Sequence, residues 1–409
     1  MKRSAANQAA ANRPRSPFKS GTNGSADYLP YGRQTIDEED IEAVVKVLRS
    51  DWLTTGPAIE EFERAFATYT GARHAVAVSS GTAALHAAIH ALGVAPGDEV
   101  IVPAITFAAT SNAVVFCGGV PVFADVKPGS LLLDAARAEE KITSKTRAIV
   151  SVDYAGQPCD YAELVTLARR HNLTLVADAC HAIGAEYQSG KVGTLADLNT
   201  FSFHPVKHIT TGEGGMVTTH DSALAARMRN FRNHGITSDH RQRTEAGAFY
   251  YEMVELGFNY RISDFQCALG VSQLRKLPAW LERRRQIAAA YDQRLQYLSG
   301  MQPLDTLTDR THAYHLYVVR IDSKSGLPSR GEVFSHLREN GIGCNVHYLP
   351  VYLHPFYRNR FGLGQGLCTA AEAAYEEILS LPIYPQMNDC DVDRVVATLE
   401  SALANGKAG

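Results

Sequence analysis

Short apolar segments alternate with helical segments through much of the chain, and this alternation constrains the fold more than any other feature of the sequence. Five segments carry the small and β-branched apolar residues typical of buried strands: 74–79, 100–103, 120–124, 148–153 and 173–178. Segments with helical character, such as 83–92 and 161–171, lie between them. Strands that alternate with helices predict a parallel sheet covered by helices on both faces. Such sheets bind ligands beyond the carboxyl ends of their strands, so we expect functional residues there.

The composition is that of an ordinary globular protein. Of the 409 residues, 45% are hydrophobic and 20% are charged, which leaves enough apolar material for a sizeable core. A net charge of −3 gives no strong attraction to a nucleic-acid polymer, and no apolar stretch is long enough to insert into a membrane. The seven cysteines include no Cys-x-x-Cys pair. This argues against a zinc ribbon or a disulfide framework and favours a cytoplasmic location.

The sequence predicts three parts. Residues 1–26 carry five basic residues, no acidic residue and few large apolar ones, and are expected to form a disordered arm. Residues 27–275 are expected to form a large α/β domain. Residues 276–409 are expected to form a smaller C-terminal α+β domain behind a long charged helix near 274–298. The arginine run 283–285 in that helix is interpreted as a solvated face with no role in ligand binding.

Polar residues follow three of the expected strands. Residues 80–82 (Ser-Gly-Thr) stand between a strand and a helix, where backbone N–H groups can hold a phosphate, although serine and threonine are also common helix caps. Asp178 ends an apolar strand, where a carboxylate is costly unless it is paired or used, and His181 follows it. Lys207 follows a further expected strand that begins near Thr200; a lone lysine would be an ordinary surface residue.

Together these groups match what pyridoxal 5′-phosphate (PLP) requires. Its aldehyde needs a lysine amine, its pyridine nitrogen a carboxylate, and its phosphate hydroxyl and N–H donors. Phe107, after another expected strand, could cover one face of the ring. The glycine-rich segment 209–215 lacks the G-x-G-x-x-G spacing and opens no helix, so no dinucleotide site is predicted. We also predict no metal site, because His181, His204 and His208 lack a three-ligand zinc pattern with a base.

Four segments of the chain resemble the signatures of the DegT/StrS-type sugar aminotransferases: 80–85, 178–184, 201–207 and 232–235. The resemblance covers roughly residues 30–400. It implies a type I PLP-dependent (aspartate aminotransferase-like) fold, with a mostly parallel sheet flanked by helices. It also implies L-glutamate as amino donor and a homodimer with shared active sites.

The resemblance further implies roles for single residues. Lys207 would bind the cofactor as a Schiff base and carry the substrate proton, Asp178 would pair with the pyridine nitrogen, and His181 would lie beside the ring. The remaining cofactor contacts would come from Gly81, Thr82, Phe107, Ser202 and Asn259, of which Asn259 would reach the cofactor phosphate of the partner subunit. Contacts to a nucleotide sugar would come from Tyr31, Asp51, Trp52, Leu53, Thr54, Asn345, Val346, His347 and Tyr348.

Within the family, residues 151–156, 209–215 and 345–350 resemble the transaminases that make UDP-4-amino-4,6-dideoxy-N-acetyl-β-L-altrosamine for pseudaminic acid. This resemblance implies a UDP-4-keto-6-deoxy-N-acetylhexosamine as the amino acceptor. Residues 52–57 are shared with enzymes that aminate a UDP-4-keto-pentose, so that acceptor stays open, as does a dTDP- or GDP-4-keto-6-deoxyhexose. His208 departs from the altrosamine-type pattern, which has proline there.

Two other readings of the same fold remain. A PLP-dependent sugar dehydratase would carry histidine in place of Lys207. A non-catalytic regulator would keep the fold as a sensor, which the intact set of cofactor residues disfavours.

Overall fold

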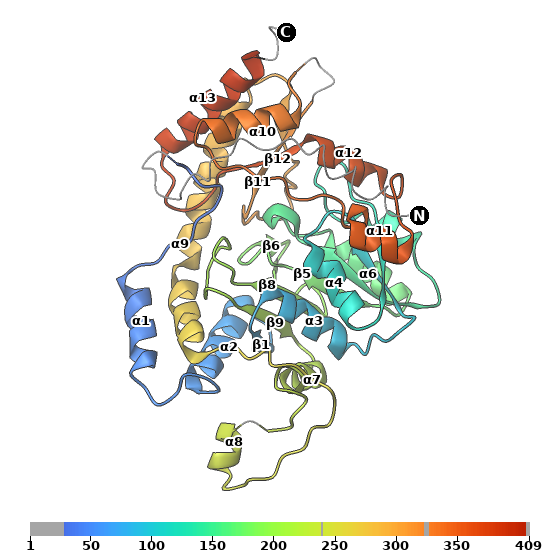
Figure 1. Ribbon diagram of the computed structural model, residues 1–409, viewed down its shortest axis with the longest axis vertical. Coiled ribbons are helices and arrows are strands. Elements are labelled where there is room, and N and C mark those ends of the chain that lie inside the picture. Colours follow the sequence, from blue (N-terminus) through green and yellow to red (C-terminus); the bar gives the residue numbers. More distant parts are fainter. Residues whose placement is uncertain (1–27, 239, 323–326, 406–409) are drawn as a thin grey trace, which may run out of the picture.

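The computed structural model describes residues 28–238, 240–322 and 327–405. Within them, a large sheet flanked by helices forms one part of the molecule and a small sheet with its own helices forms the other (Figure 1). The predicted arm, residues 1–26, lies outside the described residues. The predicted domain boundary at 275/276 falls within the long helix α9 (Asp264–Leu295), and the division into two domains stays a prediction.

The large sheet has seven strands in the order β1-β9-β8-β5-β4-β2-β3. The strands are β1 (His74–Val78), β2 (Glu99–Pro103), β3 (Val120–Ala124), β4 (Thr146–Val152), β5 (Thr174–Asp178), β8 (Leu198–Ser202) and β9 (Gly215–Thr219). Strand β9 runs antiparallel to both of its neighbours, β1 and β8, and the other neighbouring pairs are parallel. The expected mostly parallel sheet is confirmed, and β9 is a strand that the sequence analysis did not assign.

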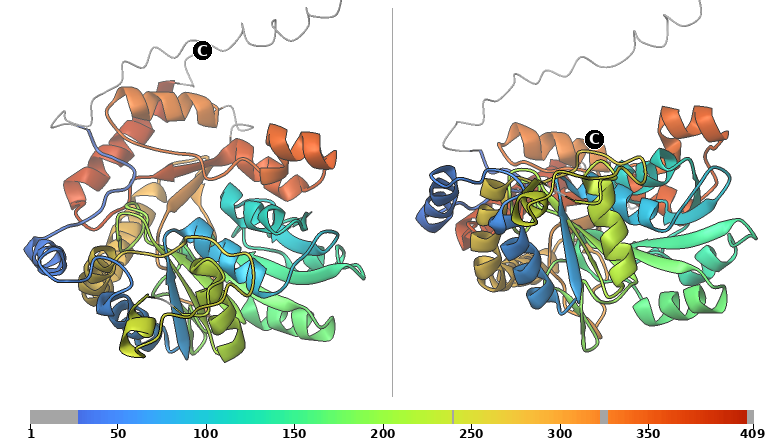
Figure 2. Two further views of the ribbon diagram at one scale, coloured as in Figure 1. Left: turned by 60° about the horizontal axis from the view of Figure 1, so that its bottom comes forward. Right: turned by 90° about the horizontal axis from the view of Figure 1, so that it is seen from below.

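Helices cover both faces of this sheet, as the two views of Figure 2 show. The helices of this part that precede α9 are α1 (Glu38–Leu48), α2 (Pro57–Thr70), α3 (Gly81–Ala91), α4 (Ala108–Phe116), α5 (Ala135–Glu139), α6 (Tyr161–Arg170), α7 (Ser222–Arg232) and α8 (His240–Glu245). Of these, α1 packs against α9, and α8 extends away from the sheet (Figure 1). Successive residues of β1 belong to different cores: Val76 and Val78 pack in the core that contains α3, whereas Ala75 and Ala77 pack in the core that contains α2. This two-sided burial explains why the strand sequences are apolar throughout.

The second part is built on a three-stranded antiparallel sheet in the order β10-β11-β12. Its elements are β10 (Met301–Pro303), β11 (Tyr317–Ile321), α10 (Arg330–Glu339), β12 (Ile378–Leu381) and α13 (Asp389–Asn405). These elements and the last turns of α9 share a separate hydrophobic core. The expected smaller α+β unit at the C-terminal end is therefore present.

The C-terminal half of the chain also returns to the large sheet. The segment between α10 and β12 contains η3 (Val351–Leu353), α11 (Pro355–Phe361) and α12 (Thr369–Glu377), and the buried residues of these three helices join the core of the large sheet. The backbone N–H of Val351 donates to the carbonyl of Ala104, 3.0 Å away, just after β2. Two further short strands, β6 (Glu186–Tyr187) and β7 (Gly190–Lys191), form a hairpin, and η1 (Tyr154–Gly156) follows β4.

The interpretation of the arginine run in α9 as a solvated face is wrong for its middle residue. Arg284 is only 1% exposed, and its guanidinium donates to the carbonyls of Tyr314 and Ile383, both 3.0 Å away. The side chain therefore braces two segments of the second part. No described helix combines the length and apolar character needed to cross a membrane.

Candidate active site

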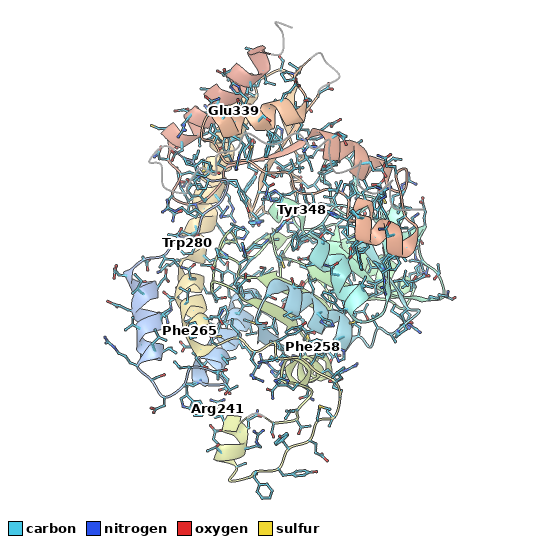
Figure 3. The ribbon with its side chains drawn as sticks, in the orientation of Figure 1. Arg241, Phe258, Phe265, Trp280, Glu339 and Tyr348 are labelled. Atoms are coloured by element: carbon cyan, nitrogen blue, oxygen red, sulfur yellow. The ribbon has the colours of Figure 1, made fainter. Side chains whose placement is uncertain are left out.

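A cavity of about 580 Å³ lies where the parallel strands of the large sheet end and the second part meets them. Val152, Asp178 and Ser202 are the last residues of β4, β5 and β8 and line one wall. Residues 345–348 line another, and Figure 3 labels Tyr348 between the two parts. The cavity therefore has the position expected for a ligand site in a parallel sheet.

Lys207 lies in the wall of this cavity, five residues after Ser202, the last residue of β8. Its Nζ atom is 3.3 Å from Nε2 of His315. Burial lowers the pKa of the Lys207 amine, while Cys180 and Asp178 act in the opposite direction. A lowered pKa increases the fraction of neutral amine, which is the nucleophilic form.

Asp178 is fixed by hydrogen bonds to its carboxylate. Oδ2 accepts from the hydroxyl of Thr110 at 2.7 Å, and Oδ1 accepts from the backbone N–H of Cys180 at 3.3 Å. The side chain is 6% exposed, and the hydroxyl of Thr106 in turn contacts that of Thr110 at 2.7 Å. A buried carboxylate oriented in this way can receive the protonated nitrogen of a pyridine ring.

The start of α3 and the end of β8 form a cradle suited to a phosphate. Ser80 caps the helix and accepts from the N–H of Ala83 at 3.1 Å, so the first-turn N–H groups of Gly81 and Thr82 remain outside the helical ladder. A Cβ atom on Gly81 would lie 2.7 Å from Cβ of Ser202. Only glycine therefore lets the Ser202 hydroxyl lie against this helix end.

Aromatic side chains form the remaining walls. Phe107 is 59% exposed despite its size, and its ring centre is 6.0 Å from that of Tyr348. Nδ1 of His181 is buried and has no hydrogen-bond partner in the part of the chain that the structure describes, and its Nε2 is 3.4 Å from the hydroxyl of Tyr348. An exposed aromatic face, an unpartnered imidazole nitrogen, an oriented carboxylate and a phosphate cradle around one lysine fit PLP. When bound, PLP supplies an aldehyde that a lysine amine can attach to and a ring that accepts electrons as a C–H bond breaks.

The structure brings together most, but not all, of the residues singled out in the sequence. The predicted residues that line the cavity are Tyr31, Gly81, Thr82, Phe107, Asp178, His181, Ser202, Lys207, Asn345, Val346, His347 and Tyr348. The remaining predicted residues, Asp51, Trp52, Leu53, Thr54 and Asn259, do not line it.

The residues outside the cavity lie close to one another elsewhere. The carbonyl of Leu53 accepts from the N–H of Asp264, and Asn259 pairs with Asn233. A second cavity of about 420 Å³, lined by Thr55, Gly56, Asn233 and Arg261 among others, adjoins them. Figure 3 labels Phe258, next to Asn259, near α7 and away from Tyr348. Their predicted roles stay predictions.

Sequence reasoning missed two groups that touch the central residues. Thr110 donates to Asp178 from the first turn of α4, and its signal was a second hydroxyl residue shortly after a strand end. His315 contacts Lys207 from a segment 108 residues further along the chain, and no local motif marks it.

The fold and the site define a PLP-dependent aminotransferase with the type I fold. The sequence profile of the DegT/DnrJ/EryC1/StrS aminotransferase family matches residues 34–400, and the chain belongs to this family. It is a sugar aminotransferase whose cofactor is PLP.

Three relatives illustrate this membership. The UDP-4-amino-4-deoxy-L-arabinose--oxoglutarate aminotransferase of Shewanella sediminis is 37% identical over 390 residues, covering 93% of this chain and 100% of that protein. PseC of Helicobacter pylori, an aminotransferase involved in the biosynthesis of pseudoaminic acid, is 33% identical, with a TM-score of 0.86 over 92% of this chain and 100% of that one. Spr1654 of Streptococcus pneumoniae, assigned as a sugar aminotransferase, is 31% identical in its PLP form, with a TM-score of 0.86 over 93% and 99%.

Proposed function

We propose that the protein transfers the amino group of L-glutamate to C4 of a UDP-linked 4-keto-6-deoxy-N-acetylhexosamine, as in the formation of pseudaminic acid precursors. The two half-reactions would follow one another in a ping-pong order. The observation that carries the proposal is that Tyr31 and residues 345–348 line the same cavity as Lys207. This position of the segment with the altrosamine-type resemblance supports a role for it in binding the amino acceptor. The likeness to PseC supports the same acceptor class.

In this proposal each residue of the cavity has a definite task. Lys207 attaches the cofactor and carries a proton between substrate and cofactor, which its lowered pKa favours. Asp178 holds the pyridine nitrogen in its protonated form, and Ser202, Gly81 and Thr82 hold the phosphate. Phe107 covers one face of the ring.

We also propose that the active form is a homodimer with shared sites. Asp51–Thr54 and Asn259 lie away from their own chain's cavity, as contacts delivered to a partner would. Leu53, Phe258 and Phe265 near them are large apolar side chains left exposed. Burial of such a group of side chains stabilises association. A cytoplasmic location completes the proposal, and the seven unpaired cysteines support it.

The acceptor can be tested directly. Purified protein would be incubated with L-glutamate and, separately, a UDP-4-keto-6-deoxy-N-acetylhexosamine, a UDP-4-keto-pentose and a dTDP-4-keto-6-deoxyhexose, and the aminated products identified by NMR. We expect the first acceptor to give the highest kcat/KM. A preference for the pentose, which the Shewanella sediminis relative makes the second candidate, would overturn the acceptor and leave the aminotransferase intact.

A further inference from the structure

The contact between His315 and Lys207 has no role in the function described so far. His315 is 6% exposed, and its Nε2 lies 3.3 Å from Nζ of Lys207. Its other ring nitrogen, Nδ1, is buried and has no hydrogen-bond partner among the described residues. The ring centres of His181 and His208 lie 4.3 and 5.6 Å away. Burial, reinforced by the charge of Lys207, lowers the pKa of His315 well below its ordinary value, so the imidazole is neutral.

The backbone bends just before His315, and this bend requires a conformation that non-glycine residues seldom adopt. Tyr314 has a φ of +48°, a left-handed conformation that is costly for a bulky residue. Its carbonyl accepts from the buried guanidinium of Arg284 at 3.0 Å. The hydrogen bond from Arg284 thus keeps Tyr314 in a strained conformation, which indicates that the position of the following side chain, His315, is important.

A glycine lets this bend reach the turn that carries His181. The carbonyl of Gly156 accepts from the N–H of Ala313 at 2.9 Å. A Cβ atom on Gly156 would lie 2.8 Å from both the carbonyl oxygen of His181 and the N–H nitrogen of Tyr314, and its φ is +109°. A side chain at 156 would therefore displace either the turn that carries His181 or the bend that carries His315.

We propose that His315 is a positioning residue that holds the amine of Lys207 whenever that amine is not bonded to the cofactor. Because none of the described residues hydrogen-bonds to Nδ1 of His315, the neutral imidazole can carry its proton on either nitrogen. Nε2 can then accept from an ammonium group or donate to an amine, and Lys207 must pass through both states while it moves a proton. The inference rests on the proposed role of Lys207 and does not depend on which sugar is the acceptor.

Several other groups surround the amine and must be separated from His315 in any test. Asp178, Cys180 and His181 face it from the end of β5, and His208 and His347 add to the histidines around it. Arg284 lies behind His315. His208 is the suitable control, because it is buried in the same cluster but hydrogen-bonds the carbonyl of Ala313 at 3.0 Å through Nε2.

The test compares four variants of the full chain: His315→Phe, His315→Gln, His315→Asn and His208→Gln. Borohydride reduction of each holoenzyme, followed by peptide mass spectrometry, first establishes whether the cofactor is attached at Lys207. Each protein is then converted by L-glutamate to the pyridoxamine phosphate form, in which the Lys207 amine is free. The pH dependence of Lys207 acetylation measures the pKa of that amine, and single-turnover kinetics with L-glutamate measure the rate.

We expect His315→Phe to lower the single-turnover rate constant about ten- to hundredfold, with a half-saturating glutamate concentration within about twofold of the wild type. The pH at which acetylation of Lys207 is half-maximal should fall by about one unit. Burial still disfavours the ammonium form, and the variant lacks the imidazole nitrogen that accepts a hydrogen bond from it. His315→Gln places an amide near Nε2 and should restore most of both values. His315→Asn carries a shorter amide and should not restore the rate or the labelling pH. If His315→Phe does not fold, the comparison of His315→Gln with His315→Asn tests the proposal.

The outcomes separate the two proposals. Attachment at a residue other than Lys207 would overturn the proposed function and this inference together. Attachment at Lys207 with unchanged labelling and rate in His315→Phe and His315→Asn would overturn only the inference. Equal losses in His208→Gln would also overturn it, because the effect would then belong to the whole histidine cluster.

Discussion

The two ends of the active-site cavity differ in the secondary structure that carries their residues. The cofactor end comprises Lys207, Asp178, Ser202 and the start of α3. These residues lie at or just after the ends of hydrogen-bonded strands and at the start of a capped helix. The end proposed to bind the sugar, called the sugar end here, comprises Tyr31 and residues 345–348, which lie in segments with little regular structure. Chemistry common to a class needs fixed geometry, and a rigid sheet supplies it. Recognition of one substrate can be changed on loops without disturbing the sheet.

The largest effect should come from Lys207→Ala. Without its amine the chain has no attachment point for the cofactor and no proton carrier, so the rate of both half-reactions should fall by about 10⁴-fold or more. The measurement is the absorption spectrum of the holoenzyme together with glutamate half-reaction kinetics. Lys207→Arg, which keeps the positive charge, is the control and should be equally inactive. A Lys207→Ala variant with the wild-type spectrum and rate would contradict the assignment of this end of the cavity to the cofactor.

Asp178→Asn should have the next largest effect. The amide keeps the shape of the carboxylate and loses the charge that holds a proton on the pyridine nitrogen, so the glutamate half-reaction should slow by about 10²- to 10³-fold. Thr110→Val removes only one hydrogen bond to that carboxylate and should slow it about tenfold or less. If Thr110→Val were the more damaging change, orientation rather than charge would be the contribution of this residue.

Gly81→Ala tests the phosphate cradle. The added Cβ would lie 2.7 Å from Cβ of Ser202, so helix and strand must separate. A cost of about 1–3 kcal/mol corresponds to a dissociation constant for PLP that is about fivefold to 150-fold higher, measured by fluorescence titration of the cofactor-free protein. Gly364→Ala is the matched control, because among the described residues, its own chain neighbours aside, no atom lies within 4 Å of the added Cβ. Equal PLP affinity in the two variants would contradict the cradle.

The sugar end should respond differently. Asn345 contacts Nε2 of His347 at 3.3 Å in the wall of the cavity. Asn345→Ala should raise the KM for the nucleotide sugar about five- to tenfold through loss of a hydrogen-bonding group, and leave the glutamate half-reaction unchanged. The two half-reactions measured on one protein serve as internal control. A slower glutamate step would show that the two ends are not separable.

The smallest effect concerns stability. Burial lowers the pKa of His347 to about 4, below the unfolded value of 6.5. The folded protein therefore binds fewer protons than the unfolded chain below pH 6.5, and the stability from neutral His347 is lost as pH falls toward 4. Between pH 6.5 and 5 the loss should be about 1–2 kcal/mol of unfolding free energy. His347→Gln should show a flatter dependence in urea titrations, and an identical slope would contradict the assigned burial.

The strand ends explain why much of the cofactor end was predictable. Asp178 and the segment 80–82 each follow an apolar strand, and parallel strands end on the same edge. Strand β9 escaped because its antiparallel pairing is a long-range choice that the glycine-rich segment before it does not encode. Arg284 escaped because a run of three arginines looks solvated, and only packing of α9 against both Tyr314 and Ile383 buries one of them.

The sugar end shows the limit of sequence reasoning. Residues 345–348 reach the cavity only because the chain crosses from one part of the molecule to the other. Residues 51–54 and Asn259 do not reach it at all within one chain, so their place was signalled by resemblance rather than by any physical pattern. His315 had neither kind of signal, and its partner Lys207 is 108 residues away.

Helix α9 connects the segment proposed to reach a partner subunit with the bend that carries His315. At its start, Asp264 accepts from the N–H groups of Gly56 and Ala58 at 2.9 and 3.0 Å, beside the segment proposed to reach a partner. Five turns later, Arg284 braces the bend that carries His315. Pro278, between them, removes one backbone hydrogen bond and leaves a place to bend. A displacement of the backbone near Gly56 can therefore be passed through α9 to Tyr314. Every link in this path is a covalent bond or a hydrogen bond, and Tyr314 precedes the histidine that contacts Lys207.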